Sequence, residues 1–154
     1  MSSPRVTECF LIRNNRVLLG RKKRGLGTGK IVGIGGKCSA GETAADCAIR
    51  EIFEETGAQV LPNQVEARGM VEWRFPNKTS WEMIASVFVV RDWQNTIAET
   101  DEIEPLWFDF DAVPYDLMWA DARMWLPRIF AGEHVNLVFV YNEDNETVAT
   151  MNIA

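Results

Sequence analysis

The sequence predicts an α+β fold in which helices cover both faces of a mixed β-sheet. Strand-like segments rich in β-branched and aromatic residues recur along the chain and are separated by polar, glycine and proline residues that favour turns. Two segments with helical spacing of apolar residues lie far apart, at residues 44–56 and 121–131. A sheet with two separated helices buries its apolar surface by carrying one helix on each face. With 154 residues, 47% of them hydrophobic, the chain 1–154 is long enough for a single domain with a substantial core.

The N-terminal part of the chain predicts a hairpin and a short strand. Residues 5–13 and 16–21 have the same mixed strand character and are joined by Asn14 and Asn15, a pair that favours a tight hairpin turn. Residues 31–37 combine apolar residues with glycines, which let the backbone approach another element closely. We expect them to form a short buried strand that leads into the first helix.

The first helix is predicted from its two ends. Thr43 and Asp46 have the spacing of a capping box, so the helix is expected to begin near Ala44. Thr56 is followed by Gly57, which can adopt the left-handed conformation of a C-terminal cap.

The remaining segments predict a second hairpin, another strand, a helix and a closing hairpin. Proline and polar residues separate the two strands of the second hairpin, and Pro127 is expected to limit or kink the second helix. In order, these segments are residues 64–75, 81–91, 106–110, 121–131, 136–141 and 147–153.

Composition excludes several classes of function. The net charge of −6 argues against a protein that binds nucleic-acid polymers, because such proteins usually carry a basic excess. The N-terminus lacks the features of a secretion signal, and no apolar stretch is long enough to span a membrane. We therefore expect a cytoplasmic protein that acts on a small molecule, without a membrane or a required protein partner.

The cysteines and the single histidine offer little for catalysis. Cys9, Cys38 and Cys47 are odd in number and lack a C-x-x-C spacing, so we expect free thiols and neither a disulfide framework nor a cysteine zinc site. His134 is the only histidine, which leaves a histidine-based zinc site or a catalytic triad without partners. We therefore expect carboxylates to be the catalytic groups.

An acidic flank on the first helix predicts a metal site. At helical spacing, Glu51, Glu54 and Glu55 lie together beside the apolar stripe, where they repel one another. Arg50, four residues before Glu54, can neutralise or orient that carboxylate, which leaves Glu51 and Glu55 for a hard divalent cation. The alternative is a solvated acidic surface without a metal.

A basic run next to a glycine-rich loop predicts phosphate binding. Four consecutive basic residues, 21–24, precede Gly25 and Gly27. Lys22 or Lys23 is the residue expected to meet phosphate groups. Here too the alternative is a solvated surface.

The spacing around the acidic flank resembles a known motif. Gly36, Glu42 and the run from Arg50 to Gly57 match the Nudix box in residue type and spacing, except that Ala58 stands where a larger aliphatic residue is usual. Because many positions are fixed at once, chance agreement is far less common than for a short motif. The resemblance implies a Nudix-type α/β/α sandwich with the mixed sheet between helices.

Further stretches resemble the MutT-related oxidised purine nucleoside triphosphate hydrolases. They are 22–27, 33–37, 99–102, 105–108 and 116–121, with 115–121 the most discriminating. The resemblance implies hydrolysis of triphosphates such as 8-oxo-dGTP or 2-hydroxy-dATP to the monophosphate and pyrophosphate, with Mg²⁺ or Mn²⁺ as cofactor. Which glutamate acts as the base stays open, because the box acids titrate together. The implied metal ligands are the Gly35 carbonyl, Glu51, Glu54 and Glu55, with Glu102 assisting. The implied catalytic residues are the three box acids and Arg50.

The resemblance also implies a base-binding pocket, in which several residues depart from the family pattern. Trp119 and Asp121 would contact the base, and Trp73 and Met83 would wall the pocket, with ordinary core packing as the alternative for the last two. Val32 stands at the base-contacting position where an asparagine is expected. The other departures are Ala122 for a second aspartate, and Glu8, Leu26 and Ile31 for threonine, phenylalanine and tryptophan.

These departures keep two other functions open. The altered pocket would suit a hydrolase of another nucleoside diphosphate derivative, such as ADP-ribose or a sugar nucleotide. A nucleotide sensor that binds without turnover is the non-enzymatic alternative. The complete set of box acids argues against the sensor, because binding alone does not require all of them.

Overall fold

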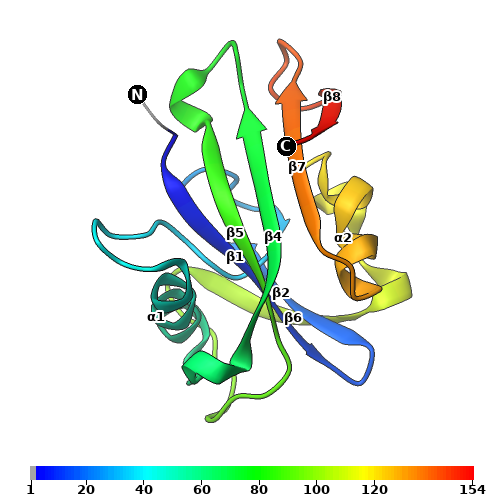
Figure 1. The fold of residues 1–154 in the computed structure, drawn as a ribbon. Coiled ribbons are helices and arrows are strands. Elements are labelled where there is room, and N and C mark those ends of the chain that lie inside the picture. The colour runs from blue at the N-terminus through cyan, green and yellow to red at the C-terminus, as the bar shows by residue number, and fades with distance from the viewer. Residues whose placement is uncertain (1–2) are drawn as a thin grey trace.

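The computed structural model describes residues 3–154, and within this range it contains a mixed sheet and two α-helices (Figure 1). The sheet has the strand order β3-β2-β1-β5-β4-β7-β8, and β6 pairs with β2 off this path. The pairs β1/β5 and β4/β7 are parallel and the others antiparallel, which confirms the predicted mixed sheet. The strands are β1 (Arg5–Arg13), β2 (Arg16–Lys22), β3 (Ile31–Val32), β4 (Val65–Arg74), β5 (Met83–Val90), β6 (Ile103–Asp109), β7 (Val135–Tyr141) and β8 (Val148–Ile153), and the helices are α1 (Ala44–Thr56) and α2 (Ala122–Phe130).

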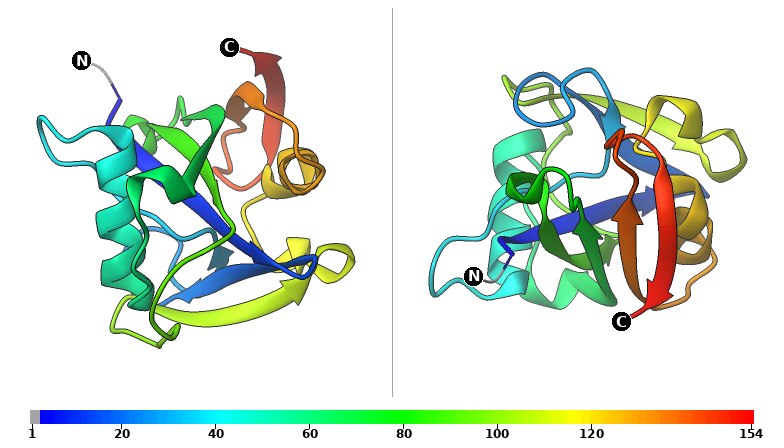
Figure 2. Two further views of the ribbon diagram at one scale, coloured as in Figure 1. Left: turned by 60° about the horizontal axis from the view of Figure 1, so that its bottom comes forward. Right: turned by 90° about the horizontal axis from the view of Figure 1, so that it is seen from above.

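The two helices lie on opposite sides of the sheet, as expected for a sandwich (Figures 1 and 2). The buried face of α1 joins one apolar cluster, which includes Ala48 and Ile52. The buried face of α2 joins the other, where the rings of Trp125 and Phe10 meet edge to face with centroids 5.8 Å apart. Burial of both clusters stabilises the three layers, because each helix removes apolar surface of the sheet from water. No helix within residues 3–154 has the length and apolar character needed to cross a membrane.

The hairpins predicted from turn residues are confirmed. Asn14 and Asn15 have φ angles of 55° and 59°, the left-handed values that a tight two-residue hairpin turn requires. β4 pairs antiparallel with β5, and β7 with β8, as expected from their strand patterns. β6 begins at Ile103, earlier than the predicted start at residue 106, because its pairing with β2 continues to the end of that strand.

The segment 31–37 is not one strand, as predicted, but two short pairings with different partners. Val32 pairs with β2, whereas the Ile34 carbonyl accepts a hydrogen bond from the Cys9 N–H in β1, with 2.6 Å between N and O. The pairing of β2 with β1 ends at Leu18, and beyond it the same edge of β2 pairs with β3, while β6 occupies the other edge of β2 throughout. The edge of β1 on the N-terminal side of Leu11 is therefore available to residues 34–38. The crossing from one partner to the other occurs at Gly33.

Helix α1 begins and ends where the sequence predicts. The Thr43 hydroxyl accepts a hydrogen bond from the Asp46 N–H at 3.1 Å, and Gly57 closes the helix in the left-handed conformation with φ of 79°. These two residues satisfy backbone groups that would otherwise lack partners at the helix ends. Ala58, the one departure from the box, is fully buried in the α1 cluster, where it affects packing.

The prediction of three free thiols is wrong. Cys38 and Cys47 form a disulfide, which joins the loop before α1 to the first turns of the helix. Cys9 is buried and is the free cysteine of the described residues. Sequence spacing could not show the pairing, because the loop returns to the helix only in the folded chain.

Reduction of this disulfide is expected to lower the free energy of unfolding. The two cysteines are separated by 9 residues in sequence, and closing a loop of this size stabilises a protein by about 2–3 kcal/mol through the unfolded state. Thermal melts with and without a thiol reductant measure the effect. Cys38→Ser should melt like the reduced wild type and show no further response to reductant. A reductant-sensitive melt in Cys38→Ser would contradict the assignment.

Candidate active site

A cavity of about 570 Å³ joins the acidic side of α1 to a group of aromatic residues at the opposite end. Strand β1, the glycine-rich segment after β3 and the ends of β4 and β5 form its walls. The sequence-predicted site residues that line it are Lys22, Val32, Gly35, Glu51, Glu55, Trp73, Met83, Glu102, Trp119 and Asp121. Lys23, Arg50 and Glu54 do not line it.

Three carboxylates converge at one end of the cavity. Oxygens of Glu51, Glu55 and Glu102 lie within 4.8 Å of one another. Glu51 and Glu55 are only 8% and 7% exposed, so the alternative of a solvated acidic surface is wrong for these two. Glu54 remains exposed and faces Arg50 instead.

This cluster fits a hard divalent cation. Burial, together with the nearby charges of Glu51 and Glu102, raises the pKa of Glu55 to about 8, although the Gly35 N–H donates a hydrogen bond to Glu55 at 2.8 Å. Burial likewise raises the pKa of Glu51. Crowded carboxylates disfavour their own ionised forms, and a cation among them would offset that repulsion. The donor set is all oxygen, as Mg²⁺ and Mn²⁺ prefer.

Two glycines before α1 allow the backbone to approach this cluster closely. A Cβ at Gly35 would lie 2.0 Å from the Thr7 carbonyl oxygen, and one at Gly36 would lie 2.5 Å from a carboxylate oxygen of Glu51. The segment is held there by the hydrogen bond from the Thr7 N–H to the Gly36 carbonyl. The glycines are therefore required by close contact with β1 and with the first box acid.

Arg50 connects the box acids to the preceding loop. Its guanidinium donates to both oxygens of Glu42 at 2.8 Å, to Glu51 at 2.8 Å and to Glu54 at 3.2 Å, and also to the Lys37 carbonyl at 3.0 Å. The expectation that Arg50 leaves Glu51 free is wrong, because Arg50 orients that carboxylate as well. The paired guanidinium lowers the pKa of Glu42 to about 2. Arg50 thus positions the loop and the acids without reaching the cavity.

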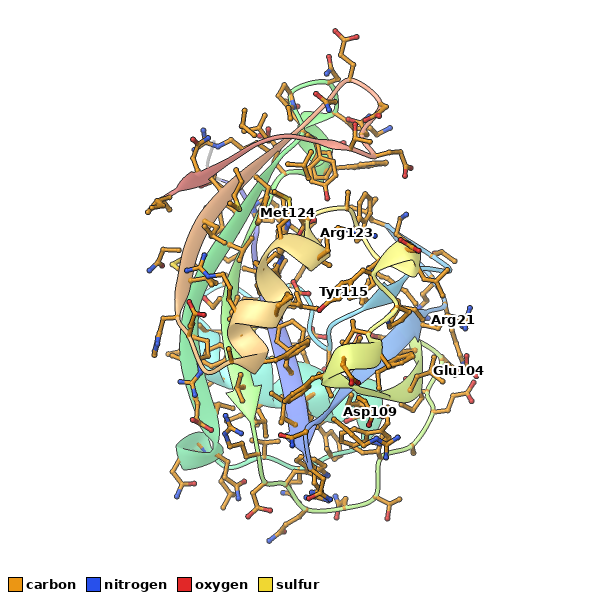
Figure 3. All side chains as sticks on the ribbon, turned by 90° about the vertical axis from the view of Figure 1, so that its right-hand side faces the viewer. Arg21, Glu104, Asp109, Tyr115, Arg123 and Met124 are labelled. Atoms are coloured by element: carbon orange, nitrogen blue, oxygen red, sulfur yellow. A yellow bond between two sulfur atoms is a disulfide. The ribbon has the colours of Figure 1, made fainter. Side chains whose placement is uncertain are left out.

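Some residues of the basic run 21–24 line the cavity, and the others form ion pairs on the surface. Lys22 and Arg24 line the cavity, and Arg24 pairs with Glu102 at 3.1 Å. The Lys23 ammonium is bound by the Glu99 carboxylate and by the Thr100 carbonyl. Arg21 pairs with Glu104 across the neighbouring strands β2 and β6 (Figure 3). Lys22 is therefore better placed than Lys23 to meet an anionic ligand.

Lys22→Ala is expected to raise the KM for a nucleoside triphosphate roughly 10-fold, because a charge-assisted hydrogen bond to phosphate is lost. Lys23→Ala is the matched control and should change KM by less than about twofold, since it removes a surface ion pair. Steady-state kinetics of both variants measure the difference. Equal effects of the two substitutions would show that the run acts only through its net charge.

Aromatic side chains form the opposite end of the cavity. Phe75 and Tyr141 stack with ring centroids 4.5 Å apart, and Trp81 and Trp119 meet edge to face at 6.1 Å. Trp73 and Met83 come from the paired ends of β4 and β5, which places both on the cavity wall. Flat apolar walls of this kind suit a heterocyclic base.

Asp121, predicted to contact the base, is already satisfied by protein donors. It is 3% exposed, and one oxygen accepts the indole N–H of Trp73 at 2.9 Å and that of Trp125 at 2.8 Å. The Tyr141 hydroxyl donates to the other oxygen. Three donors occupy most of the acceptor sites of the carboxylate, so Asp121 anchors the aromatic walls.

Phe75, Trp81 and Tyr141 also line the cavity, and no pattern in the sequence pointed to them. Glu8, which stands where the family resemblance implies threonine, lines the cavity too. The alternation of side chains along β1 indicated that Glu8 points inward, because it shares one face of the strand with Val6 and Phe10, and both of these are buried. A glutamate on a core-directed face indicates either a polar partner or a cavity.

Known proteins are similar to this chain in sequence and in fold. The NUDIX domain model matches residues 3–129. An oxidized purine nucleoside triphosphate hydrolase from Danio rerio is 39% identical over 126 residues, which cover 82% of this chain and 79% of that protein. A protein of the same name from Mus musculus is 35% identical over 130 residues, 84% of this chain and 81% of that one. The crystal structure of a mutator MutT protein from Bacillus halodurans has a TM-score of 0.81 and 25% identity, and the match covers 97% of each chain. The chain therefore belongs to the NUDIX domain family, as its Nudix box and its sandwich fold indicate.

Proposed function

We propose that this protein hydrolyses purine nucleoside triphosphates, including oxidised ones such as 8-oxo-dGTP and 2-hydroxy-dATP, to the monophosphate and pyrophosphate. The observation that carries the proposal is that one cavity is lined both by a carboxylate cluster and by aromatic side chains. Such a cavity suits both a metal-bound phosphate chain and a planar base. The names of the two relatives with 39% and 35% identity support the same activity.

The proposed metal is Mg²⁺, with Mn²⁺ as a substitute. Glu51, Glu55 and Glu102 would hold it together with the Gly35 carbonyl, and when bound it would neutralise phosphate charge and lower the pKa of a coordinated water. Glu54 is included only on the family resemblance, because in this structure its carboxylate pairs with Arg50.

The protein's own groups have distinct tasks in this proposal. Lys22 binds the phosphate chain from the basic side of the cavity. Arg50 keeps Glu51 in place, and the Gly35 N–H fixes one oxygen of Glu55. The box acids orient the attacking water and accept its proton as a coupled set. Trp73, Met83, Val32 and Trp119 wall the base, and Asp121 fixes the indole of Trp73.

The substrate in this proposal is a free nucleotide of the cytoplasmic pool. A reducing cytoplasm would keep Cys38 and Cys47 as thiols, so the activity should not require their disulfide. Cys38→Ser provides a direct check of that requirement.

Incubation with Mg²⁺ and a nucleotide panel, followed by chromatography of the products, tests the proposal. The panel contains 8-oxo-dGTP, 2-hydroxy-dATP, dGTP, dATP, ADP-ribose and a sugar nucleotide. We expect monophosphate and pyrophosphate from the purine triphosphates, and none without metal. Cleavage of ADP-ribose or the sugar nucleotide alone would support the alternative hydrolase, and binding without any product would support the sensor.

A further inference from the structure

One polar side chain in the cavity has no role in the proposed function so far. The Glu8 side chain extends from β1 against the backbone of Gly33. A Cβ added at Gly33 would lie 2.8 Å from Cγ and 2.9 Å from Oε1 of Glu8. Glycine at this crossing point between strand partners therefore makes the space that the Glu8 side chain occupies. The carboxyl group lines the cavity, close enough to Lys22 and Asp121 to be affected by their charges.

The nearby donors are committed to another carboxylate. Trp73, Trp125 and Tyr141 all donate to Asp121 and none to Glu8. Each indole has a single N–H, so the two tryptophans have no donor left for Glu8. Glu8 is half-buried in the cavity wall and lies close to the Gly33 N–H. A base that displaces water from its carboxyl group costs free energy unless the base offers hydrogen bonds in return.

The polar side chains that the family resemblance implies at the base edge are either replaced by apolar ones or largely occupied. Val32 and Ala122 are apolar and line the same cavity, and Asp121 is occupied by its three donors. We propose that Glu8 is the specificity-determining residue of this chain and forms hydrogen bonds with the edge of the purine base. This inference rests on the proposed function.

The protonation state of Glu8 suggests which edge it recognises. Burial, together with the charge of Asp121, raises the pKa of Glu8 to about 8, even though the Gly33 N–H and Lys22 act to lower it. At neutral pH the carboxyl group is therefore mainly neutral and offers one donor beside one acceptor. A lactam edge, in which an N–H lies beside a C=O, is its complement. Guanine has one such edge at N1 and C6, and an 8-oxopurine has a second at N7 and C8.

Two near-isosteric substitutions of Glu8 separate the effect of its hydrogen bonds from the effect of its side-chain shape. Glu8→Gln keeps one donor and one acceptor, whereas Glu8→Met keeps the length of the side chain and removes both. We expect Glu8→Met to lower kcat/KM for 8-oxo-dGTP about 10- to 100-fold and Glu8→Gln to retain most of it. Glu66→Met, which replaces a glutamate of β4 that pairs with Arg91 outside the cavity, is the control and should match the wild type.

A substrate without a base shows whether the effect is confined to recognition. The 5′-triphosphate of abasic deoxyribose should be hydrolysed equally by wild type and Glu8→Met. Titration calorimetry with dGMP in EDTA adds a metal-free readout, in which Glu8→Met should bind more weakly by a similar factor. Thermal melts verify that both variants fold.

The outcomes distinguish this inference from the proposed function. If the wild type hydrolyses no purine triphosphate, the proposed function is wrong. If the wild type hydrolyses them but Glu8→Met has wild-type kcat/KM and dGMP affinity, or loses the abasic substrate equally, the role of Glu8 is wrong. A loss in Glu8→Gln as large as in Glu8→Met would also overturn the proposed donor-acceptor pairing.

Discussion

Glu55→Gln is expected to lower kcat at least 100-fold, because it removes a charge from the carboxylate cluster that would hold the metal. Glu55 is buried beside Glu51 and Glu102, so no water-exposed carboxylate can replace it easily. Steady-state kinetics over a range of Mg²⁺ concentrations measure both the loss of turnover and any weaker dependence on metal.

The same substitution should leave the fold intact. Glutamine retains an oxygen that can accept the Gly35 N–H, and it relieves repulsion among crowded carboxylates. In EDTA, the variant should therefore melt no lower than the wild type, whereas the rise in melting temperature on adding Mg²⁺ should shrink. Glu66→Gln, a substitution on β4 outside the cavity, is the matched control for both measurements. Wild-type turnover in Glu55→Gln would overturn the assignment of the cluster.

Local signals explain why much of the fold could be predicted from sequence. Thr43 and Gly57 define the ends of α1 through contacts within a few residues, and Asn14 and Asn15 define the first hairpin in the same way. The spacing of the box likewise places Glu51 and Glu55 one helical turn apart on the side of α1 that lines the cavity. Such features depend on short stretches of chain, which a sequence displays directly.

The features that sequence did not predict depend on distant partners. The contact of Asp121 with the base stays a prediction, but the sequence did not show that Trp73 of β4 and Tyr141 of β7 donate to its oxygens. Lys22 or Lys23 was expected at the phosphates, and the sequence did not show that Glu99 and Thr100 bind the Lys23 ammonium. In both cases the residue type was read correctly as a polar group near the site. Which ligand that group meets is decided by neighbours that only the folded chain brings together.

The division of residues 31–37 between two strand partners has the same origin. A strand pattern indicates that a segment pairs, but it does not indicate with which strand. The crossing at Gly33 makes room for Glu8, and the pairing with β1 that follows holds Gly36 beside Glu51. The departure from a simple strand is therefore what brings β1, the glycines and the box acids into one cavity.

Gly36→Ala is expected to lower kcat at least 10-fold with little loss of stability. The new Cβ would lie 2.5 Å and 2.6 Å from Oε2 and Cδ of Glu51, so either the backbone or the carboxylate has to move. The backbone is held by the hydrogen bond between the Thr7 N–H and the Gly36 carbonyl. Gly36 is not among the glycines with positive φ, so alanine causes no backbone strain there. The Glu51 carboxylate is the end of a flexible side chain and will be displaced, which spoils the metal site.

Gly41→Ala is the matched control, because it should show the opposite pattern. Gly41 has a φ of 79° and no atom within 4 Å of an added Cβ, so alanine there meets backbone strain and no collision. It should lower the free energy of unfolding by about 1 kcal/mol and leave kcat and the Mg²⁺ dependence unchanged. Thermal melts and metal-dependent kinetics on the two variants measure both quantities.

Gly36→Ala with wild-type kcat and Mg²⁺ dependence would show that Glu51 tolerates displacement and does not hold the metal. A lower melting temperature with unchanged kinetics in Gly41→Ala would confirm that strain in this loop alone does not disturb the carboxylate cluster.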